Sequence, residues 1–543
     1  MSLTQTPAST SGASPAPAPA RSDHGGWRSW GRRYPFLCST VVCLLLAALS
    51  AAVLPTVPSY DPWAWISWGR EVVDPHLSFA VSGGPSWKPL PVFPFTTVYA
   101  LFGSAAAPTL WVITARAGGL LGLVAAYRLA ARLIGAPRWA AVAAGLVAAG
   151  GIVVTQEWFY EMFRGTSEPM LIACALWAID RHLERRYGWA FVLGVATGLI
   201  RPEAWPFLIV YAVWLWVRQP RLRGLLLAGL FAIPFFWFVP PWVGSNQPFL
   251  AAQHAAEYNG ALGKYPLFTV LRRGLDVQTI PLLVFGAVAV AMAWLRRPRD
   301  RLVLALGAGV VVWWVVVVGM TLEGYPGLER FYLPAAGVTC VLAGVGIVRL
   351  AELASAAVAD RSAGGGADRS AGGGADRSGG GGADRSGGGG ADRSRRDGLG
   401  AGVGIAVVVA LLALTIPFTG GRINEARRQN SVASAAVTRL DQLSAAVATV
   451  GGHDRVFPCK SSFAAVNHGA QTALAWKLHV TLGRVGTSMR HQGVMFVGPH
   501  DTIDGIAAPI SPSLTQSQLL ATVGAWRVYR VTAPGADQRC VGG

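Results

Sequence analysis

An aspartate, a lysine and an arginine follow the first long apolar segment of this 543-residue chain. Asp61 comes directly after that segment, Lys88 begins the sequence Lys-Pro-Leu-Pro, and Arg116 lies near the start of another apolar run. A carboxylate in a partly dehydrated site can act as a general base. Lysine and arginine side chains suit a phosphate group. These residue types predict proton transfer beside a bound phosphate.

Each of these residues also has a simpler interpretation. Asp61 precedes a proline, and an aspartate in that position is suited to capping the N-terminus of a helix. Glu71 is a second candidate for the base, with Asp74 behind it. Lys88 and Arg116 could instead extend their charged ends to lipid headgroups. The residue types alone leave these alternatives open.

The composition places these residues in a membrane protein. Hydrophobic residues make up 52% of the chain and charged residues 14%, with 21 Trp and 21 Phe, whereas soluble domains contain about 25% charged residues. The net charge of +18 comes largely from arginine clusters in short loops between apolar runs. Such a distribution sets membrane topology and argues against nucleic acid as a partner. Basic patches of this kind also attract anionic membrane lipid.

The apolar runs indicate the fold class and the topology. A spanning helix needs about 20 mostly apolar residues, and the chain is predicted to contain about eleven spans. Every dense arginine cluster then falls on one side, which the positive-inside rule identifies as the cytoplasm. We therefore predict an all-α multi-pass protein of the cell (plasma) membrane. Its N-terminus is expected in the cytoplasm, and a small C-terminal α/β domain is expected outside it.

This topology divides the chain into segments of different character. They are a disordered cytoplasmic tail (1–33), a transmembrane catalytic core (34–350) with its first outer loop at 58–109, a low-complexity cytoplasmic loop (351–398), a last transmembrane helix (399–418) and an extracytoplasmic domain (419–543). The tail is rich in Ser, Pro and Ala, and the loop repeats Ala-Asp-Arg-Ser followed by glycines. Neither composition can bury a core.

The first outer loop is predicted to lie along the membrane. Residues 62–73 form an amphipathic segment, whose Trp63, Trp65 and Trp68 are expected on the bilayer surface, where they would hold Asp61 near the membrane. Residues 89–102 are apolar but too short and too rich in proline for a span. They are predicted to form a second helix in the interface.

The C-terminal domain shows a mixed pattern. A helix is predicted at 424–450, and strands at 493–497 and 525–531. Cys459 and Cys540 are the two cysteines of this polar domain, so a disulfide between them is expected if the domain lies outside the cytoplasm. The sequence shows no cysteine and histidine spacing typical of a zinc site.

Residues 34–135 resemble a known superfamily. They combine the acid in a short first outer loop with Lys88-Pro89-Leu90-Pro91, Phe102-Gly103 and Ala115-Arg116 at the opening of a long helix. This pattern resembles the GT-C superfamily of membrane glycosyltransferases, and most closely its polyprenyl-phosphate-sugar transferases. These include the bacterial aminoarabinose and protein mannosyl transferases and the actinobacterial mannosyl and arabinosyl transferases. In two departures, Leu90 replaces a second proline, and Asp61 lacks the adjacent acid that many relatives carry.

The resemblance implies a transferase that moves a sugar, with inversion, from a polyprenyl-phosphate donor to an envelope glycan, lipoglycan or protein. The composition indicates an actinobacterium, in which mannose or arabinose would be the natural donor sugar. By resemblance the base is Asp61, with Glu71 as the alternative. The other expected roles are lipid-phosphate binding by Lys88, Arg116, Arg201 and Arg330, and substrate contacts from Trp63, Trp87, Tyr160, Arg164 and Glu168. The scheme requires neither a cofactor nor a metal ion.

Two other classes of function remain as alternatives. A polyprenyl-lipid transporter or flippase predicts ionisable residues within its spans, whereas the charges here are predicted at helix ends. A non-catalytic scaffold would keep the same fold and bind a lipid or a partner. Substitution of Asp61 separates these classes, because only the enzyme requires that carboxylate.

Overall fold

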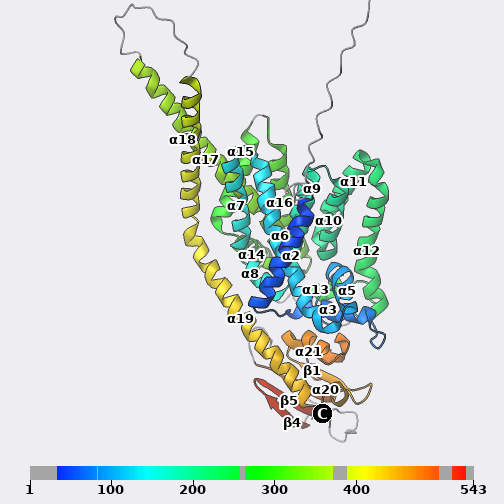
Figure 1. Cartoon of the computed structure of the whole chain (residues 1–543). Helices are drawn as coiled ribbons and strands as arrows, with labels where there is room; N and C mark the ends of the chain where they lie inside the picture. The colour runs from blue at the N-terminus through cyan, green and yellow to red at the C-terminus, as the bar shows by residue number, and fades with distance from the viewer. Residues whose placement is uncertain are drawn as a thin grey trace, which may run out of the picture.

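A bundle of apolar helices and a small α/β domain are joined by one long helix, α19 (Ile416–Thr449) (Figure 1). The computed structural model describes residues 34–81, 83–256, 263–296, 298–370, 388–499 and 516–533, and its side chains except those of residues 104, 359–370 and 388–400. We call the end of the bundle that faces the small domain the domain end.

The bundle helices are apolar along most of their length. In chain order they are α2 (Pro35–Val53), α6 (Ala107–Ile134), α7 (Arg138–Val153), α9 (Glu168–Leu183), α10 (Tyr187–Ile200), α11 (Trp205–Arg218), α12 (Arg223–Ser245), α15 (Ile280–Leu295), α16 (Arg301–Leu322), α17 (Leu333–Ser370) and α18 (Gly388–Ala413). Helix α6 packs against α2, α7 and α9, and α17 packs against α7 and α15. Glycines permit this close packing: a Cβ at Gly344 of α17 would lie 2.3 Å from the Ala144 carbonyl oxygen of α7.

The length of these helices shows a multi-pass membrane protein. Among the described residues, 5 helices are long and apolar enough to cross a membrane, or up to 8 if each bent pair of helices counts as one span. The predicted number of about eleven spans is not confirmed. Helices α9, α10 and α11 have 16, 14 and 14 residues, which is short for a straight span.

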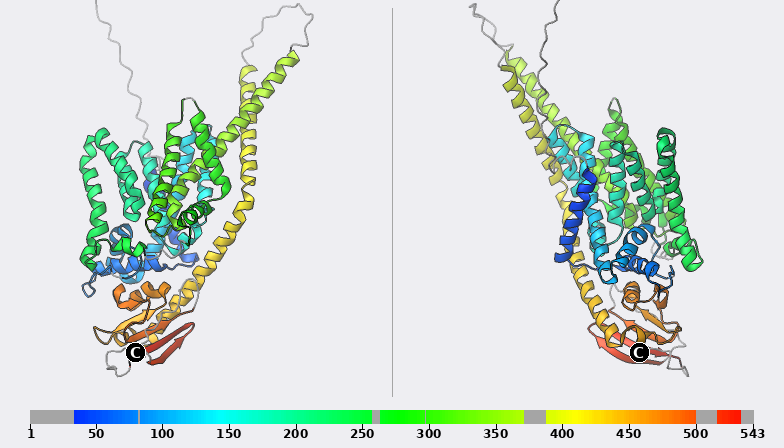
Figure 2. Two further views of the ribbon diagram at one scale, coloured as in Figure 1. Left: turned by 180° about the vertical axis from the view of Figure 1, so that it is seen from behind. Right: turned by 45° about the vertical axis from the view of Figure 1, so that its right-hand side comes forward.

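Short helices fill the space at the domain end (Figure 2). They are α3 (Tyr60–Val73), α4 (Pro89–Pro91), η1 (Val92–Thr96), α5 (Thr97–Leu101), η2 (Ser104–Ala106), α8 (Trp158–Arg164), η3 (Pro202–Ala204), α13 (Leu250–Ala256), α14 (Pro266–Val277) and η6 (Glu329–Tyr332), with η4 (Pro220–Leu222) in another loop. Helix α3 packs closely on α5 and η1, because Thr96 Oγ1 donates to the Trp65 carbonyl at 2.8 Å and Gly69 leaves room for Thr96.

The predicted place of the α3 tryptophans is wrong. Trp63, Trp65 and Trp68 are 7%, 0% and 0% exposed, so they do not lie open on a bilayer surface. They belong to a hydrophobic core that also includes Leu474 and Leu478 of the C-terminal domain. The domain covers α3, and burial against it replaces the expected contact with lipid.

The C-terminal domain is a mixed sheet with helices. After α19 come α20 (Gly452–Val456), β1 (Phe463–Val466), η7 (His468–Ala470), α21 (Gln471–Lys477), η8 (Leu482–Arg484), β2 (Val485–Gly486), β3 (Gly493–Val497), β4 (Gln516–Val523) and β5 (Trp526–Thr532). The strand order is β2-β1-β3-β5-β4. Strand β1 is parallel to β2 and β3, and β5 is antiparallel to β3 and β4. The small α/β domain, its first helix and the two predicted strands are therefore confirmed.

Two predictions fall partly outside the described residues. Helix α17 continues to Ser370 and α18 begins at Gly388, so helices extend into the segment predicted to be a loop. Extending an existing helix costs much less than starting one, which favours such continuation. Residues 371–387, the tail 1–33 and Cys540 lie outside the described residues. The predicted disulfide between Cys459 and Cys540 stays a prediction.

Candidate active site at the domain end

Charged residues from distant segments meet at the domain end of the bundle. Asp61 lies in the first turn of α3, and Arg330 lies in η6. Although the two are 269 positions apart, Arg330 Nη1 donates to Asp61 Oδ2 at 3.2 Å. Helix α3 begins at Tyr60 with Ser59 as its N-cap, so the alternative interpretation of Asp61 as the capping residue is wrong. The Asp61 carboxylate is directed by the ion pair instead.

A second group of charges is held by Glu168, the first residue of α9. Lys88 Nζ donates to Glu168 Oε1 at 2.8 Å and to Ser167 Oγ at 2.9 Å. Arg201, at the end of α10, donates to the same carboxylate oxygen. Burial lowers the pKa of Lys88, and the neighbouring carboxylate of Glu168 opposes that effect. Glu168 therefore holds two buried cations side by side.

A cavity of about 180 Å³ opens between these two groups. Its charged lining residues are Asp61, Lys88, Arg201 and Arg330, and its other lining residues are Pro85, Ser86, Ile200, Pro202, Trp237, His254, Ala255, Tyr325, Pro326, Leu328 and Phe331. An engineered cavity of about 150 Å³ holds a benzene molecule. The cavity can therefore hold one ring-sized group between a carboxylate and three cations.

Two guanidinium groups in the cavity wall retain buried donors. Among the described residues, Arg201 Nε and Arg330 Nε have no hydrogen-bond partner. A buried polar group without a partner costs about 1–3 kcal/mol. An anion with several acceptor oxygens, placed beside both arginines, would offset this cost. The arrangement suits a phosphate group.

Glu71, the alternative base, does not line this cavity. Ten residues of α-helix after Asp61 correspond to about 15 Å along the helix axis. Glu71 Oε2 accepts a hydrogen bond from the Ala80 backbone N–H at 3.2 Å, and the side chain is buried near Leu482 of the C-terminal domain. Burial raises the pKa of Glu71 to about 8. Glu71 is therefore a buried, largely protonated carboxyl at the interface with the domain.

We expect Glu71→Gln to stabilise the protein increasingly as the pH rises. The folded protein holds the Glu71 proton up to a pKa of about 8, whereas the unfolded chain releases it near the ordinary glutamate pKa of 4.5. The wild type therefore loses stability between these two pH values, and the glutamine variant does not. Melting curves of purified protein in detergent should show a gain in Tm that grows from pH 5 to pH 8 and then levels off. A gain that is equal at all pH values would contradict the expectation.

Two other predicted site residues face away from the cavity. Trp87 is fully buried, donates from Nε1 to the Phe236 carbonyl at 3.0 Å and packs against Trp68, so it is not open to a sugar. Arg116 donates from Nη2 to the Pro55 carbonyl at 2.6 Å and from Nη1 to Ser50 and Thr56. Arg116 therefore holds the chain at the end of α2. Its hydrogen-bond donors, which the sequence predicted to bind phosphate, are engaged there.

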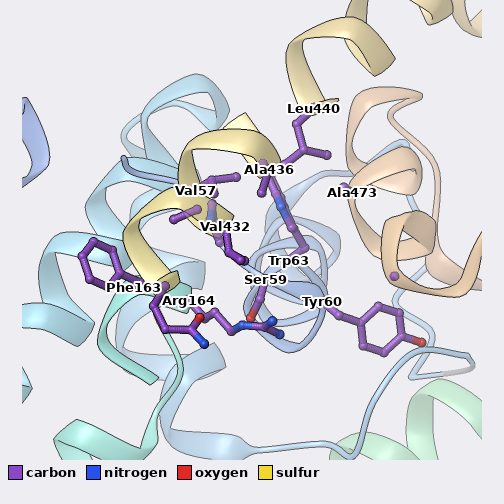
Figure 3. A pocket seen from close by; sticks show the side chains of 14 residues that line it. Val57, Ser59, Tyr60, Trp63, Phe163, Arg164, Val432, Ala436, Leu440 and Ala473 are labelled. Atoms are coloured by element: carbon purple, nitrogen blue, oxygen red, sulfur yellow. The ribbon is translucent and has the colours of Figure 1, made fainter. Parts of the chain in front are cut away.

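The remaining predicted residues lie at a second, smaller cavity or beside it. Trp63 and Arg164 line a cavity of about 80 Å³ between α3, α8 and α19, which Figure 3 shows from close by. The Arg164 guanidinium lies 3.8 Å from the centre of the Tyr160 ring. Tyr160 also interacts electrostatically with Arg330. Tyr160 lines neither cavity and contacts Arg164 at the smaller one.

Sequence reasoning missed several residues in or beside the cavity that Asp61 lines. Ser86, His254 and Tyr325 line it, and Glu203 accepts from Arg201 at 3.4 Å. Tyr325 and Glu203 could have been found as polar residues in loops beside arginines, because they stand close to Arg330 and Arg201 in sequence. No spacing linked His254 to the others. In the described part of the chain, no group of three or more His, Cys, Asp or Glu side chains could hold a metal ion.

Comparison with solved structures identifies the fold of the chain. No protein-family model matches the chain, and no curated protein matches its sequence. Among solved structures, the apo state of ArnT from Cupriavidus metallidurans is 15% identical, with a TM-score of 0.50 over 92% of this chain and 98% of that chain. The same enzyme bound to undecaprenyl phosphate gives 15% identity and a TM-score of 0.49 over 93% and 98%.

An oligosaccharyltransferase from Archaeoglobus fulgidus is more distant, with 14% identity and a TM-score of 0.39 over 82% of this chain and 62% of that chain. We therefore base the assignment of the fold on the match to apo ArnT, which spans nearly the whole of both chains. The chain has the same fold as apo ArnT, and this agrees with the fold that the resemblance in the sequence implied.

Proposed function

We propose that this protein is a membrane glycosyltransferase that takes its sugar from a polyprenyl-phosphate donor. The observation that carries the proposal is the cavity in which one carboxylate, Asp61, faces Lys88, Arg201 and Arg330. The buried donors of both arginines without partners among the described residues support a phosphate there. ArnT, whose apo structure has this fold, has also been solved bound to undecaprenyl phosphate.

A third cavity, which we call the apolar groove, provides room for the polyprenyl chain. It has a volume of about 420 Å³ and lies between α9, α10, α11, α16 and α17. At one end it is lined by Ala204 and Pro334, which stand three and four residues after the two arginines of the polar cavity. Its other lining residues are almost all apolar, including Phe207 and Trp313. A lipid chain in this groove would place its phosphate beside Arg201 and Arg330.

The proposed reaction uses these residues directly. An acceptor hydroxyl attacks the anomeric carbon of the sugar from the face opposite the phosphate, and Asp61 takes the hydroxyl proton. The bond between the anomeric carbon and the phosphate oxygen breaks, and polyprenyl phosphate leaves with the electron pair. Lys88, Arg201 and Arg330 offset the charge that develops on this leaving group. The sugar is transferred with inversion.

Arg330 connects donor binding to the base. In the structure its Nη1 engages Asp61. A donor phosphate that accepts hydrogen bonds from Arg330 would compete for this guanidinium and leave Asp61 available for the acceptor hydroxyl. The ion pair would then keep the carboxylate correctly placed until the donor arrives.

The donor sugar, the acceptor and the orientation in the membrane are inferred from the sequence. We infer mannose or arabinose as the donor sugar and an envelope glycan, lipoglycan or protein as the acceptor. The arginine clusters support a cytoplasmic N-terminus, which places the domain end and the C-terminal domain outside the cytoplasm.

The test is sugar transfer by the purified full chain in liposomes. Radiolabelled polyprenyl-phosphate mannose and polyprenyl-phosphate arabinose are supplied in turn, with an envelope extract as the acceptor. Transfer from either donor supports the proposal and identifies the sugar. A folded protein that transfers neither sugar overturns the donor assignment and favours a scaffold or a lipid transporter. Movement of the labelled lipid across the liposome membrane then separates those two.

The apolar groove permits a selective variant. Gly309 of α16 lines the groove, and a Cβ there would meet no described atom within 4 Å. We expect Gly309→Phe to fill the groove and raise the KM for a long-chain donor at least tenfold, with little change in kcat. Gly319→Phe is the matched control, because Gly319 is an equally open position on the same helix outside the groove. Equal KM values for the two variants would place the lipid chain elsewhere.

A further inference from the structure

The C-terminal domain grips the first residue of α3. The Tyr60 hydroxyl donates to Gln471 Oε1 at 2.9 Å, and Thr472 Oγ1 donates to the Tyr60 backbone carbonyl at 2.9 Å. The His468 ring stacks on the Tyr60 ring, with the ring centroids 4.5 Å apart. We call His468, Gln471 and Thr472 the Tyr60 clamp. It holds both the side chain and the backbone of Tyr60.

The clamp is itself rigidly supported. Gln471 Nε2 donates to the Val485 carbonyl of β2 at 2.7 Å, so the amide that receives the Tyr60 hydroxyl is fixed to the sheet. Gln471 and Thr472 are 6% and 0% exposed. Buried hydrogen bonds between fixed groups restrain geometry more strongly than exposed ones.

The other side of the same turn is held by the bundle. The Ser59 backbone N–H donates to the Arg164 carbonyl of the bundle at 3.0 Å, and within α3 the Trp63 N–H donates to the Ser59 carbonyl at 3.0 Å. In Figure 3 the Tyr60 ring extends away from Arg164 and toward the C-terminal domain. The start of α3 is therefore fixed between the bundle and the domain.

Asp61 is the next residue after Tyr60, so the clamp restrains the backbone that carries the Asp61 carboxylate. We propose that the C-terminal domain completes the active site by positioning this base, with Gln471 and Thr472 as positioning residues. The inference rests on the proposed role of Asp61. A displacement of about 1 Å at a reacting group can cost about a hundredfold in rate. Loosening the clamp should therefore lower kcat while donor binding by Lys88, Arg201 and Arg330 persists.

The far end of α3 provides an internal control. There Arg70 donates to the Trp476 and Val480 carbonyls at 3.0 and 3.1 Å, and His479 Nε2 lies 2.8 Å from Asp74 Oδ2. These contacts dock the same domain on the same helix, but they are remote from Asp61. Asp74→Asn removes the charge of one contact and keeps an oxygen that can accept from the His76 backbone N–H.

The experiment compares Tyr60→Phe, Gln471→Leu, the double variant and Asp74→Asn in the liposome transfer assay. We expect each single clamp variant to lower kcat about tenfold, with an unchanged KM for the donor. The double variant should be no slower than Gln471→Leu, because both changes remove the same hydrogen bond. Thr472→Val should also be slow, and Thr472→Ser, which keeps the hydroxyl, should restore the rate. Asp74→Asn should match the wild type.

The outcomes separate the clamp from the proposed function. If the wild type transfers sugar and the clamp variants are equally fast, the clamp role is overturned and the transferase remains. If Asp74→Asn is as slow as Gln471→Leu, general domain docking accounts for the effect and positioning is overturned. If the wild type transfers neither sugar, the proposed function is overturned and the clamp role with it. Melting curves show that each variant is folded, and Tyr60→Phe tests the clamp even if Gln471→Leu does not fold.

Discussion

Asp61→Asn is expected to lower kcat for sugar transfer by about 10²–10⁴-fold, which is the usual contribution of a general base. The asparagine side chain has nearly the same shape, and its carbonyl oxygen can still accept from Arg330, which pairs with Asp61 at 3.2 Å in the wild type. The variant therefore removes the proton acceptor without opening a cavity. Binding of polyprenyl phosphate should persist, because Lys88, Arg201 and Arg330 remain.

The matched control for Asp61→Asn is Glu71→Gln on the same helix. Glu71 is buried under the C-terminal domain and does not line the cavity, so its amide variant should transfer sugar at the wild-type rate. The measurement is single-turnover transfer with saturating donor, together with titration of fluorescent polyprenyl phosphate. The opposite result, with Asp61→Asn active and Glu71→Gln inactive, would move the base to Glu71. Full activity in both variants would argue against either carboxylate as the base.

Lys88→Met is expected to lower kcat/KM by about 10²–10³-fold, as for the loss of one electrostatic contact to a developing charge. Lys88 is a cation in the cavity wall and is held by Glu168 at 2.8 Å. Its removal weakens binding of the donor phosphate and stabilisation of the leaving group together. Both the KM for the donor and kcat should therefore change, unlike in Gly309→Phe, where only KM changes.

The ion pair of Lys88 requires a stability control. Removing one partner of a buried pair can cost about 3–5 kcal/mol, because the other charge stays buried. Arg201 still contacts Glu168 and limits this loss. A double variant that also replaced Glu168 would leave the buried Arg201 without this partner, so the control is the melting curve of Lys88→Met itself, which should stay near that of the wild type. A large fall in Tm would show that Lys88 acts as a structural partner of Glu168 and that the loss of activity follows from the loss of the fold.

Local sequence signals predicted the elements of this protein well. The apolar runs and the low content of charge indicated a multi-pass bundle, and the alternating runs near residues 493 and 526 indicated strands of the small domain. These predictions succeed because a membrane requires long apolar helices and because strand patterns depend on neighbours in sequence. The motif around Lys88 also led to a residue that lines the cavity.

Residue type alone did not show which charged and aromatic side chains share the cavity. Lys88 and Arg116 have the same kind of sequence signal, yet Lys88 lines the cavity and Arg116 binds the end of α2. Asp61 and Glu71 occupy one helix, but only Asp61 lines the cavity, because the two residues lie almost three turns apart. The direction in which each side chain points depends on the elements that pack against its helix.

The sequence by itself determined the membrane setting, the helical bundle, the small α/β domain and the chemical types of the candidate site. Only the tertiary structure decided that Asp61 meets Arg330 across 269 positions and that one carboxylate, Glu168, holds both Lys88 and Arg201. The burial of the α3 tryptophans and the grip on Tyr60 were also decided there, because both depend on the docking of a domain that begins more than 300 residues later. Hydropathy is a property of short segments, whereas these contacts arise from the packing of segments that are distant in the chain.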